Sequence, residues 1–147
     1  TVVVAGHGAD AVTRAATDFS DDIAVVVQNE QNGTGHAVAT ALPALTGFTG
    51  KIVVLYGDTP FLTAETLLTL AASEADVTVL GFRPQDPKRY GRLVTDGADL
   101  LRIVEYKDAT EAERAITLCN SGVLACDTRH ASPAGRNIPC TETAAFL

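Results

Sequence analysis

The sequence predicts an α/β domain in which a mostly parallel sheet carries helices on both faces. Short apolar runs alternate with helix-like stretches through the first half of the 147 residues. This order favours right-handed crossovers between parallel strands. The predicted strands are apolar throughout rather than alternating, which indicates burial on both faces. The composition, 46% apolar and 20% charged, is typical of a globular domain.

The individual elements follow from apolar runs and the turn residues between them. In the first half we expect strands at 2–5, 23–28, 51–56 and 76–82, and helices at 10–17, 35–42 and 64–72. Thr63 is predicted to be the N-cap of the third helix. In the second half we expect a hairpin from strands at 90–94 and 100–105, a short helix within 107–115 and a strand over 116–126.

Charge and hydropathy exclude several classes of protein. A net charge of −7 argues against a nucleic-acid partner, and no apolar run is long enough to cross a membrane. The chain opens on what reads as a strand without a basic leader, so we expect neither a signal peptide nor a complete beginning. Cys119, Cys126 and Cys140 match no common metal spacing and are predicted to be buried free thiols, which indicates a cytoplasmic protein.

Two loops that leave predicted strands are the first candidates for a ligand site, because ligands bind at the carboxyl ends of parallel strands. In one loop the Gln28 amide, the Gly33 backbone and the Thr34 hydroxyl can read a nucleobase edge, or they form only a polar loop. In the other, Asp58 follows Tyr56 and Gly57, and its carboxylate suits Mg²⁺ bound with phosphates. The alternative is an exposed Asp58 that caps a turn.

The second half holds three further candidates. Gly91 can offer its backbone to a sugar, and Glu105 can accept hydrogen bonds from sugar hydroxyls or lie on a solvated charged face. The amide of Asn120 can bind the same sugar, or the segment is a structural turn. We interpret His36 as a partly buried helix residue that contacts the sheet, not as a general base.

Five motifs occur in a fixed order along the chain. They are Gln-x-x-x-x-Gly-Thr-Gly-His-Ala from position 28, Leu-Tyr-Gly-Asp from 55, Tyr-Gly-Arg from 90, Ile-Val-Glu-x-Lys-Asp-Ala-Thr from 103 and Asn-x-Gly from 120. This order resembles the uridyltransferase domain of the bacterial bifunctional N-acetylglucosamine-1-phosphate uridyltransferase/glucosamine-1-phosphate acetyltransferase family. The resemblance implies a Rossmann-like fold of the nucleotide-diphospho-sugar transferase type, incomplete at the N-terminus. It makes residues 1–127 a partial uridyltransferase domain and 128–147 its divergent tail.

The resemblance also implies a reaction and a set of binding residues. UMP passes from UTP to N-acetylglucosamine 1-phosphate, giving UDP-N-acetylglucosamine for peptidoglycan synthesis and pyrophosphate, with no side chain as nucleophile. Mg²⁺ is the implied cofactor, held by Asp58, and a trimer is implied only for the full-length family. The implied contacts are Gln28, Gly33 and Thr34 for uracil, Tyr56, Gly57 and Asp58 for ribose and phosphates, and Gly91, Glu105 and Asn120 for the sugar.

The chain departs from this family in two places. The glycine-rich phosphate-binding loop and its lysine have no counterpart, so we expect weak UTP binding and little turnover. The metal-binding asparagine near the family's C-terminal end has no clear match, and Asn137 is only a weak candidate. Two other hypotheses stay open: a thymidylyl- or guanylyltransferase of the same fold, and a non-catalytic nucleotide-binding module.

Overall fold

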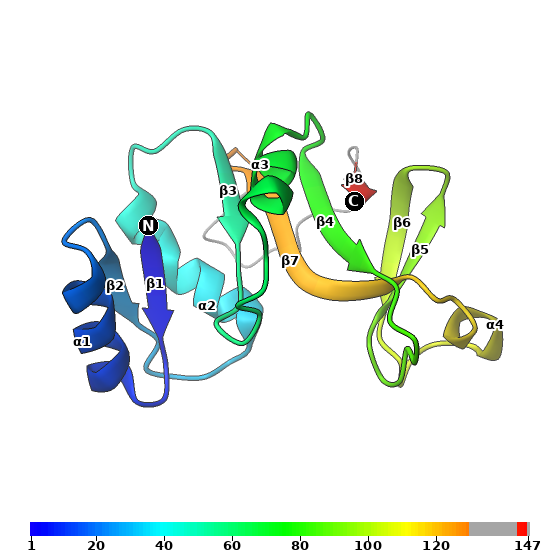
Figure 1. The fold of residues 1–147 in the computed structure, drawn as a ribbon, viewed down its shortest axis with the longest axis horizontal. Coiled ribbons are helices and arrows are strands. Elements are labelled where there is room, and N and C mark those ends of the chain that lie inside the picture. Colours follow the sequence, from blue (N-terminus) through cyan, green and yellow to red (C-terminus); the bar gives the residue numbers. More distant parts are fainter. Residues whose placement is uncertain (130–143, 147) are drawn as a thin grey trace. The chain divides into compact units, whose positions relative to one another are not determined.

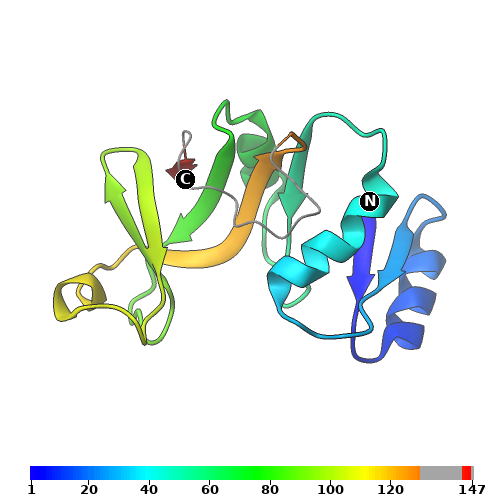
Figure 2. The same ribbon diagram turned by 180° about the vertical axis from the view of Figure 1, so that it is seen from behind.

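A computed structural model describes residues 1–129 and 144–146, and its chain divides into two compact units (Figures 1 and 2). The described part of unit one is residues 1–49, and that of unit two is residues 50–129 and 144–146. Cys140 and Asn137 lie outside the described residues. Among the helices of the described part, none is long and apolar enough to cross a membrane.

Unit one is a β-α-β-α segment (Figure 1). Strand β1 (Val2–Ala5) pairs in parallel with β2 (Ala24–Val27), and helix α1 (Ala9–Phe19) connects them. Helix α2 (Thr34–Ala41) follows and continues into the 3-10 helix η1 (Leu42–Leu45). The parallel pairing and the order of elements confirm the prediction for this unit.

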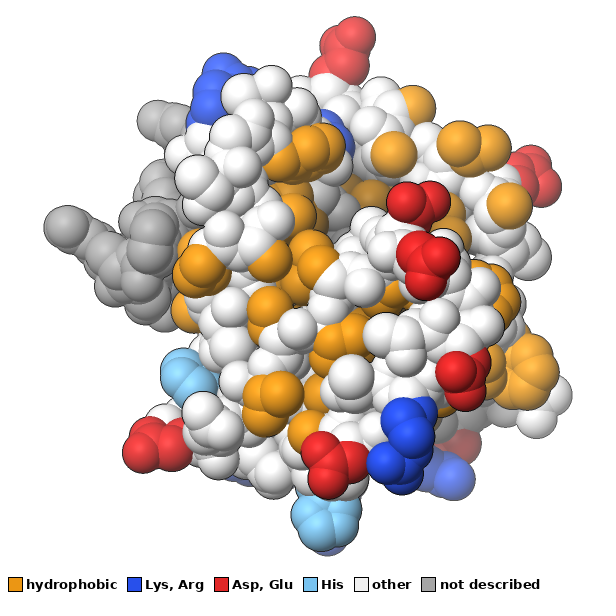
Figure 3. Space-filling model, turned by 90° about the vertical axis from the view of Figure 1, so that its left-hand side faces the viewer, with side chains coloured by type: hydrophobic (Ala, Val, Ile, Leu, Met, Phe, Trp, Pro, Cys, Tyr) orange, Lys and Arg blue, Asp and Glu red, His pale blue; other side chains and the backbone are white. Residues whose placement is uncertain are grey.

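The predicted burial of both strand faces is not found in unit one. Ala5 is buried, but the remaining residues of β1 and β2 are half-buried or exposed, and Val27 keeps 46% of its surface accessible. Within residues 1–49 the sheet of this unit has two strands, and such a narrow ribbon cannot bury both of its faces and both of its edges. Hydrophobic side chains accordingly reach the surface on the side of the molecule drawn in Figure 3.

The described residues of unit two form a mixed sheet of six strands. Its strands are β3 (Lys51–Val54), β4 (Val77–Phe82), β5 (Arg92–Asp96), β6 (Asp99–Val104), β7 (Cys119–Asp127) and β8 (Ala144–Phe146), and its helices are α3 (Ala64–Ala72) and α4 (Glu111–Arg114). The strand order is β3-β7-β4-β8-β6-β5. The sheet bends where β7 leaves β4 toward the β5–β6 hairpin (Figures 1 and 2).

The α/β class is confirmed, whereas the parallel arrangement is met only in part. Strand β7 runs antiparallel to both β3 and β4, so that those two strands are parallel to each other, as their α3 connection predicts. Strand β8 pairs in parallel with β4. The antiparallel character comes from β7, which returns after the hairpin and inserts between two strands that are neighbours in sequence. A local pattern does not predict such a long-range insertion.

The helix caps and the core of unit two follow the sequence closely. The Thr63 hydroxyl accepts a hydrogen bond from the Thr66 N–H at 3.2 Å, which confirms the predicted N-cap of α3. Leu70 of α3 is fully buried against β7. Cys119 and Cys126 are buried free thiols, as predicted, and burial raises the pKa of both.

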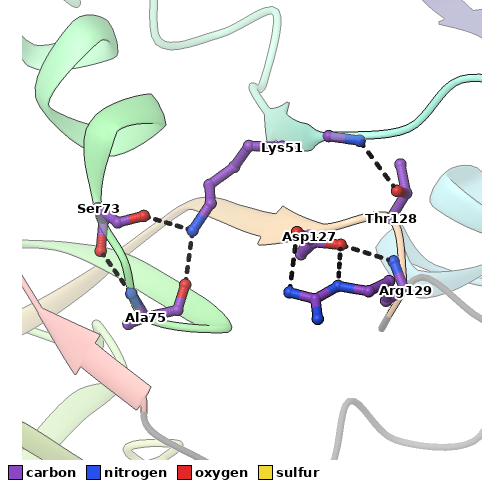
Figure 4. A network of polar contacts seen from close by, with 7 residues as sticks. Lys51, Ser73, Ala75, Asp127, Thr128 and Arg129 are labelled. Carbon is purple, nitrogen blue, oxygen red and sulfur yellow. Dashed lines mark hydrogen bonds and ion pairs between the residues drawn. The ribbon is translucent and has the colours of Figure 1, made fainter.

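A polar network fastens one end of the sheet (Figure 4). The Lys51 ammonium donates to the carbonyl oxygens of Ser73 and Ala75 at 2.5 and 2.6 Å, which ties β3 to the turn after α3. The Gly50 N–H donates to the Thr128 hydroxyl at 3.2 Å, which closes the same end of β7. These contacts hold the beginning of β3 in position.

Candidate functional site

An open pocket of about 470 Å³ lies in unit two, and we call it the sugar pocket. Five of the nine residues predicted for the site line it, and they come from four separate stretches of sequence. The lining residues are Tyr56, Asp58, Thr59, Arg89, Tyr90, Gly91, Glu105, Asn120, Ser121 and Gly122.

One wall of the sugar pocket is built on Gly91. The Asn120 N–H donates to the Gly91 carbonyl at 2.9 Å, which joins the segment before β5 to the beginning of β7. A Cβ atom on Gly91 would lie 3.3 Å from Glu105 Oε1. The missing side chain thus leaves room for the Glu105 carboxylate. The Oδ1 of Asn120 accepts from the Gly122 N–H at 2.9 Å, so its amide NH₂ group remains the part able to donate to a ligand.

The aromatic ring of Tyr56 lies against Gly122. Gly122 has φ of +84°, and a Cβ atom there would be 2.6 Å from Tyr56 Cε2, so both the conformation and the contact require glycine. The hydroxyl and the N–H of Thr59 both donate to the Tyr56 carbonyl, at 2.9 and 3.1 Å. This turn after β3 leaves Asp58 exposed at the pocket. Gly57, in the same turn, is not among the lining residues.

Arg92 holds the loop that carries Arg89, Tyr90 and Gly91, although only 2% of Arg92 is exposed. Its guanidinium donates to four backbone carbonyls. The acceptors are Pro87 at 3.4 Å, Lys88 at 3.1 Å, Tyr90, and Arg114 at 3.5 Å. Lys88 has φ of +41°, so this loop contains a strained residue that the bonds to Arg92 stabilise.

Sequence reasoning missed the roles of Arg92, Arg89 and Gly122. From the sequence, Arg92 is only the last residue of the Tyr-Gly-Arg motif, and no local signal marks it as buried, because arginine is rarely buried. Among the residues that the structure describes, Arg89 is the only cationic one that lines the sugar pocket. Gly122 was seen as part of a turn, but nothing local indicates which ring packs on it.

The charged groups of the pocket are sparse. Asp58 and Glu105 are exposed carboxylates, and Arg89 is the one cation among the lining residues. Within residues 1–129 and 144–146, no group of three or more His, Cys, Asp or Glu side chains is arranged to hold a metal ion. A cation at Asp58 would therefore need most of its ligands from substrate and water.

The predicted base-binding residues lie together in unit one, on the segment 28–36 that we call the base loop. Gln28 follows β2, and its N–H donates to the Ala5 carbonyl at 2.8 Å. Its side-chain Nε2 donates to the Gly33 carbonyl at 3.2 Å and lies 2.9 Å from Nδ1 of His36. Thr34 begins α2 and is exposed. His36 is half-buried, as interpreted from the sequence, and its ring contacts the Gln28 side chain.

The described residues form an α/β fold that carries two clusters of predicted ligand-binding residues. Residues 1–122 match the model of the MobA-like NTP transferase domain, and the chain belongs to this family. Two relatives are named bifunctional protein GlmU. The protein from Paracoccus denitrificans is 62% identical over 126 residues, and that from Roseobacter denitrificans is 62% identical over 129 residues. These matches confirm the family recognised from the motifs. They cover 86% of this chain but only 28% and 29% of the relatives' length.

Solved structures share the fold at low sequence identity. HddC from Yersinia pseudotuberculosis is similar with a TM-score of 0.74 and 19% identity, over 99% of this chain and 68% of that chain. A putative glucose-1-phosphate thymidylyltransferase from Bacillus anthracis is similar with a TM-score of 0.68 and 18% identity, over 88% and 53%. At this identity the likeness establishes the fold and nothing more.

Proposed function

We propose that this chain serves the transfer of UMP from UTP to N-acetylglucosamine 1-phosphate, which yields UDP-N-acetylglucosamine and pyrophosphate. One observation carries the proposal: residues predicted from scattered motifs to bind one sugar, Gly91, Glu105 and Asn120, line a single pocket together with Tyr56 and Asp58. The identity of 57–62% to proteins named bifunctional GlmU supports it. Two buried free cysteines agree with a cytoplasmic location.

The sugar pocket offers the groups that an N-acetylated sugar requires. The exposed carboxylate of Glu105 can accept hydrogen bonds from hydroxyl groups, and the amide NH₂ of Asn120 can donate to the N-acetyl carbonyl. Gly91, which lacks a side chain, leaves room for the Glu105 carboxylate beside Asn120. We assign the sugar to these three residues, and the uracil to Gln28, Gly33 and Thr34 of the base loop.

The phosphates call for positive charge, and the residues present fit a magnesium ion. Mg²⁺ in proteins commonly takes one or two carboxylates and completes its shell with phosphate oxygens and water. The exposed Asp58 at the pocket provides one such carboxylate. When bound, the ion would offset phosphate charge. Arg89 can add a guanidinium to the same phosphates.

The reaction needs no covalent intermediate with the protein. A phosphate oxygen of the sugar phosphate attacks the α-phosphorus of UTP, a new P–O bond forms, and the bond to pyrophosphate breaks. The protein contributes alignment of the two substrates and neutralisation of charge. By binding the sugar, Glu105 and Asn120 would hold its phosphate, the nucleophile, in place.

The test combines localisation of binding with turnover. N-acetylglucosamine 1-phosphate is titrated into the ¹⁵N-labelled chain, and we expect amide shifts at Gly91, Glu105 and Asn120. UTP with Mg²⁺ should shift residues 28–36 of the base loop. Pyrophosphate release is then measured with both substrates. We expect the chain to release little, and Asp58→Ala to lose what release there is. Shifts confined to other residues, or measurable release that Asp58→Ala leaves unchanged, would contradict the proposal.

A further inference from the structure

The orientation of the Gln28 amide is decided by its two partners. The carbonyl oxygen of Gly33 can only accept a hydrogen bond, and it lies 3.2 Å from one end of the amide. That end must therefore be the nitrogen, since an amide oxygen there would place two acceptors in contact. The Gly33 oxygen also accepts from the Ala37 N–H at 3.2 Å, which reinforces its role as an acceptor inside the loop.

The same argument fixes the state of His36. The second hydrogen on Gln28 Nε2 has His36 Nδ1 as its partner at 2.9 Å, so Nδ1 must carry a lone pair. A neutral imidazole with an unprotonated Nδ1 carries its hydrogen on Nε2. Both N–H groups of the Gln28 amide are then used within the base loop. The only atom that the amide can offer to a ligand is Oε1, a hydrogen-bond acceptor.

We propose that His36, as the neutral Nε2–H tautomer, is a positioning residue that presents Gln28 as an acceptor and thereby selects uracil over cytosine. This rests on the proposed function of the base loop. Uracil carries an N–H at position 3, whereas cytosine has a bare nitrogen there, so an acceptor at this point favours uracil. Without the His36 acceptor, one Gln28 N–H becomes available and the amide no longer discriminates in this way.

Two substitutions of His36, one that keeps a hydrogen-bond acceptor and one that removes it, test the proposal. His36→Asn places an oxygen where Nδ1 stands and keeps an acceptor for Gln28, whereas His36→Leu keeps the bulk and removes the acceptor. The control is Asn32→Ala, which deletes a 3.1 Å hydrogen bond to Glu30 in the same loop without touching Gln28. Dissociation constants for UTP and CTP with Mg²⁺ are measured by calorimetry for the four proteins.

We expect His36→Leu to lose about tenfold in the preference for UTP over CTP, the size of one net hydrogen bond. His36→Asn and Asn32→Ala should keep most of that preference. A wild-type chain that prefers UTP and a His36→Leu variant that prefers it equally would overturn the proposal while leaving the proposed function standing.

A second measurement tests the inference about His36 even if neither nucleotide binds. An absence of nucleotide binding would contradict the base-loop part of the proposed function and not the inference about His36. The ¹⁵N shifts of the His36 ring report the tautomer directly in the free protein at neutral pH. Supporting results are a hydrogen on Nε2 and slow exchange of the Gln28 side-chain amide that becomes fast in His36→Leu. A hydrogen on Nδ1, or Gln28 exchange that His36→Leu leaves unchanged, would overturn it.

Discussion

The base loop of unit one and the sugar pocket of unit two are held in place in different ways. In the base loop, the groups that would face the ligand bind one another: Gln28 contacts both Gly33 and His36. In the sugar pocket, Glu105 and Asp58 are exposed, and the buried Arg92 supports the loop that precedes β5. The base loop is held by hydrogen bonds among its own residues and depends little on buried residues. The sugar pocket is assembled from segments far apart in sequence, so it depends on the buried residues that hold those segments together.

This difference separates specificity from stability. Substitutions in the base loop should alter which base is bound with little effect on folding, because its residues are mostly exposed. Substitutions behind the sugar pocket should cost stability first and binding as a consequence. Four predictions test this division, beginning with the largest expected effect.

Replacement of Arg92 should have the largest effect on stability. Arg92→Met keeps much of the buried stem but leaves four carbonyls without their donor, so we expect a loss of about 3 kcal/mol in the free energy of unfolding. Arg92→Lys should lose less, because its ammonium keeps the charge but cannot reach four acceptors. Urea denaturation with an unchanged m-value measures both. An Arg92→Met protein within 1 kcal/mol of wild type would contradict this account.

Replacement of Gly122 should distort the sugar pocket and lower the free energy of unfolding by less than replacement of Arg92. Gly122→Ala places a methyl group 2.6 Å from the Tyr56 ring at a φ of +84°, so the ring must move and the backbone is strained by about 1–2 kcal/mol. Gly57→Ala is the control for stability, because a Cβ atom there meets open space. Thermal unfolding and the Tyr56 ring resonances compare the two. Equal unfolding temperatures would show that Tyr56 does not pack on Gly122.

Arg92 and Gly122 also show which features of the structure cannot be predicted from the sequence. Apolar runs and caps predicted most elements within a few residues, since the apolar runs and the Thr63 cap are local signals. Motif order predicted five residues that share the pocket. The contact of Tyr56 with Gly122 joins positions 66 residues apart, and the insertion of β7 between β3 and β4 is equally long-range. Such contacts depend on the packing of the whole sheet, which no local pattern contains.

Replacement of Arg89 should weaken ligand binding without lowering the free energy of unfolding. Arg89 therefore contrasts, within unit two, with the buried Arg92. It is the only cation among the described residues that line the sugar pocket, so Arg89→Met should weaken binding of N-acetylglucosamine 1-phosphate by about tenfold. Binding of unphosphorylated N-acetylglucosamine should not change. Arg83→Met is the matched control, because Arg83 donates to Thr117 at 2.6 Å and is not among the lining residues. Calorimetry at constant ionic strength decides. The same loss with the unphosphorylated sugar would rule out a phosphate contact.

The smallest predicted effect is a pH dependence in the scaffold of unit two. Glu113 accepts hydrogen bonds from the hydroxyl and the N–H of Thr110, at 2.7 and 2.8 Å, and pairs with Arg102. The bonds from Thr110, more than the charge of Arg102, lower the pKa of Glu113. A lowered pKa in the folded state means that the ionised carboxylate stabilises the protein above the ordinary carboxyl range. That contribution is lost as the pH falls through the lowered value.

Glu113→Gln should therefore be modestly less stable than wild type near neutral pH, and the difference should shrink as the pH falls through and below the ordinary carboxyl range. The control is Glu111→Gln, because Glu111 lies in the same helix but is exposed and makes none of these contacts. Urea denaturation at a series of pH values measures the difference. A gap that stays constant or widens on acidification would mean that Glu113 stabilises α4 by its shape rather than by its charge. The hydrogen bonds between Thr110 and Glu113, and with them the link from Arg102 to α4, would then be independent of pH.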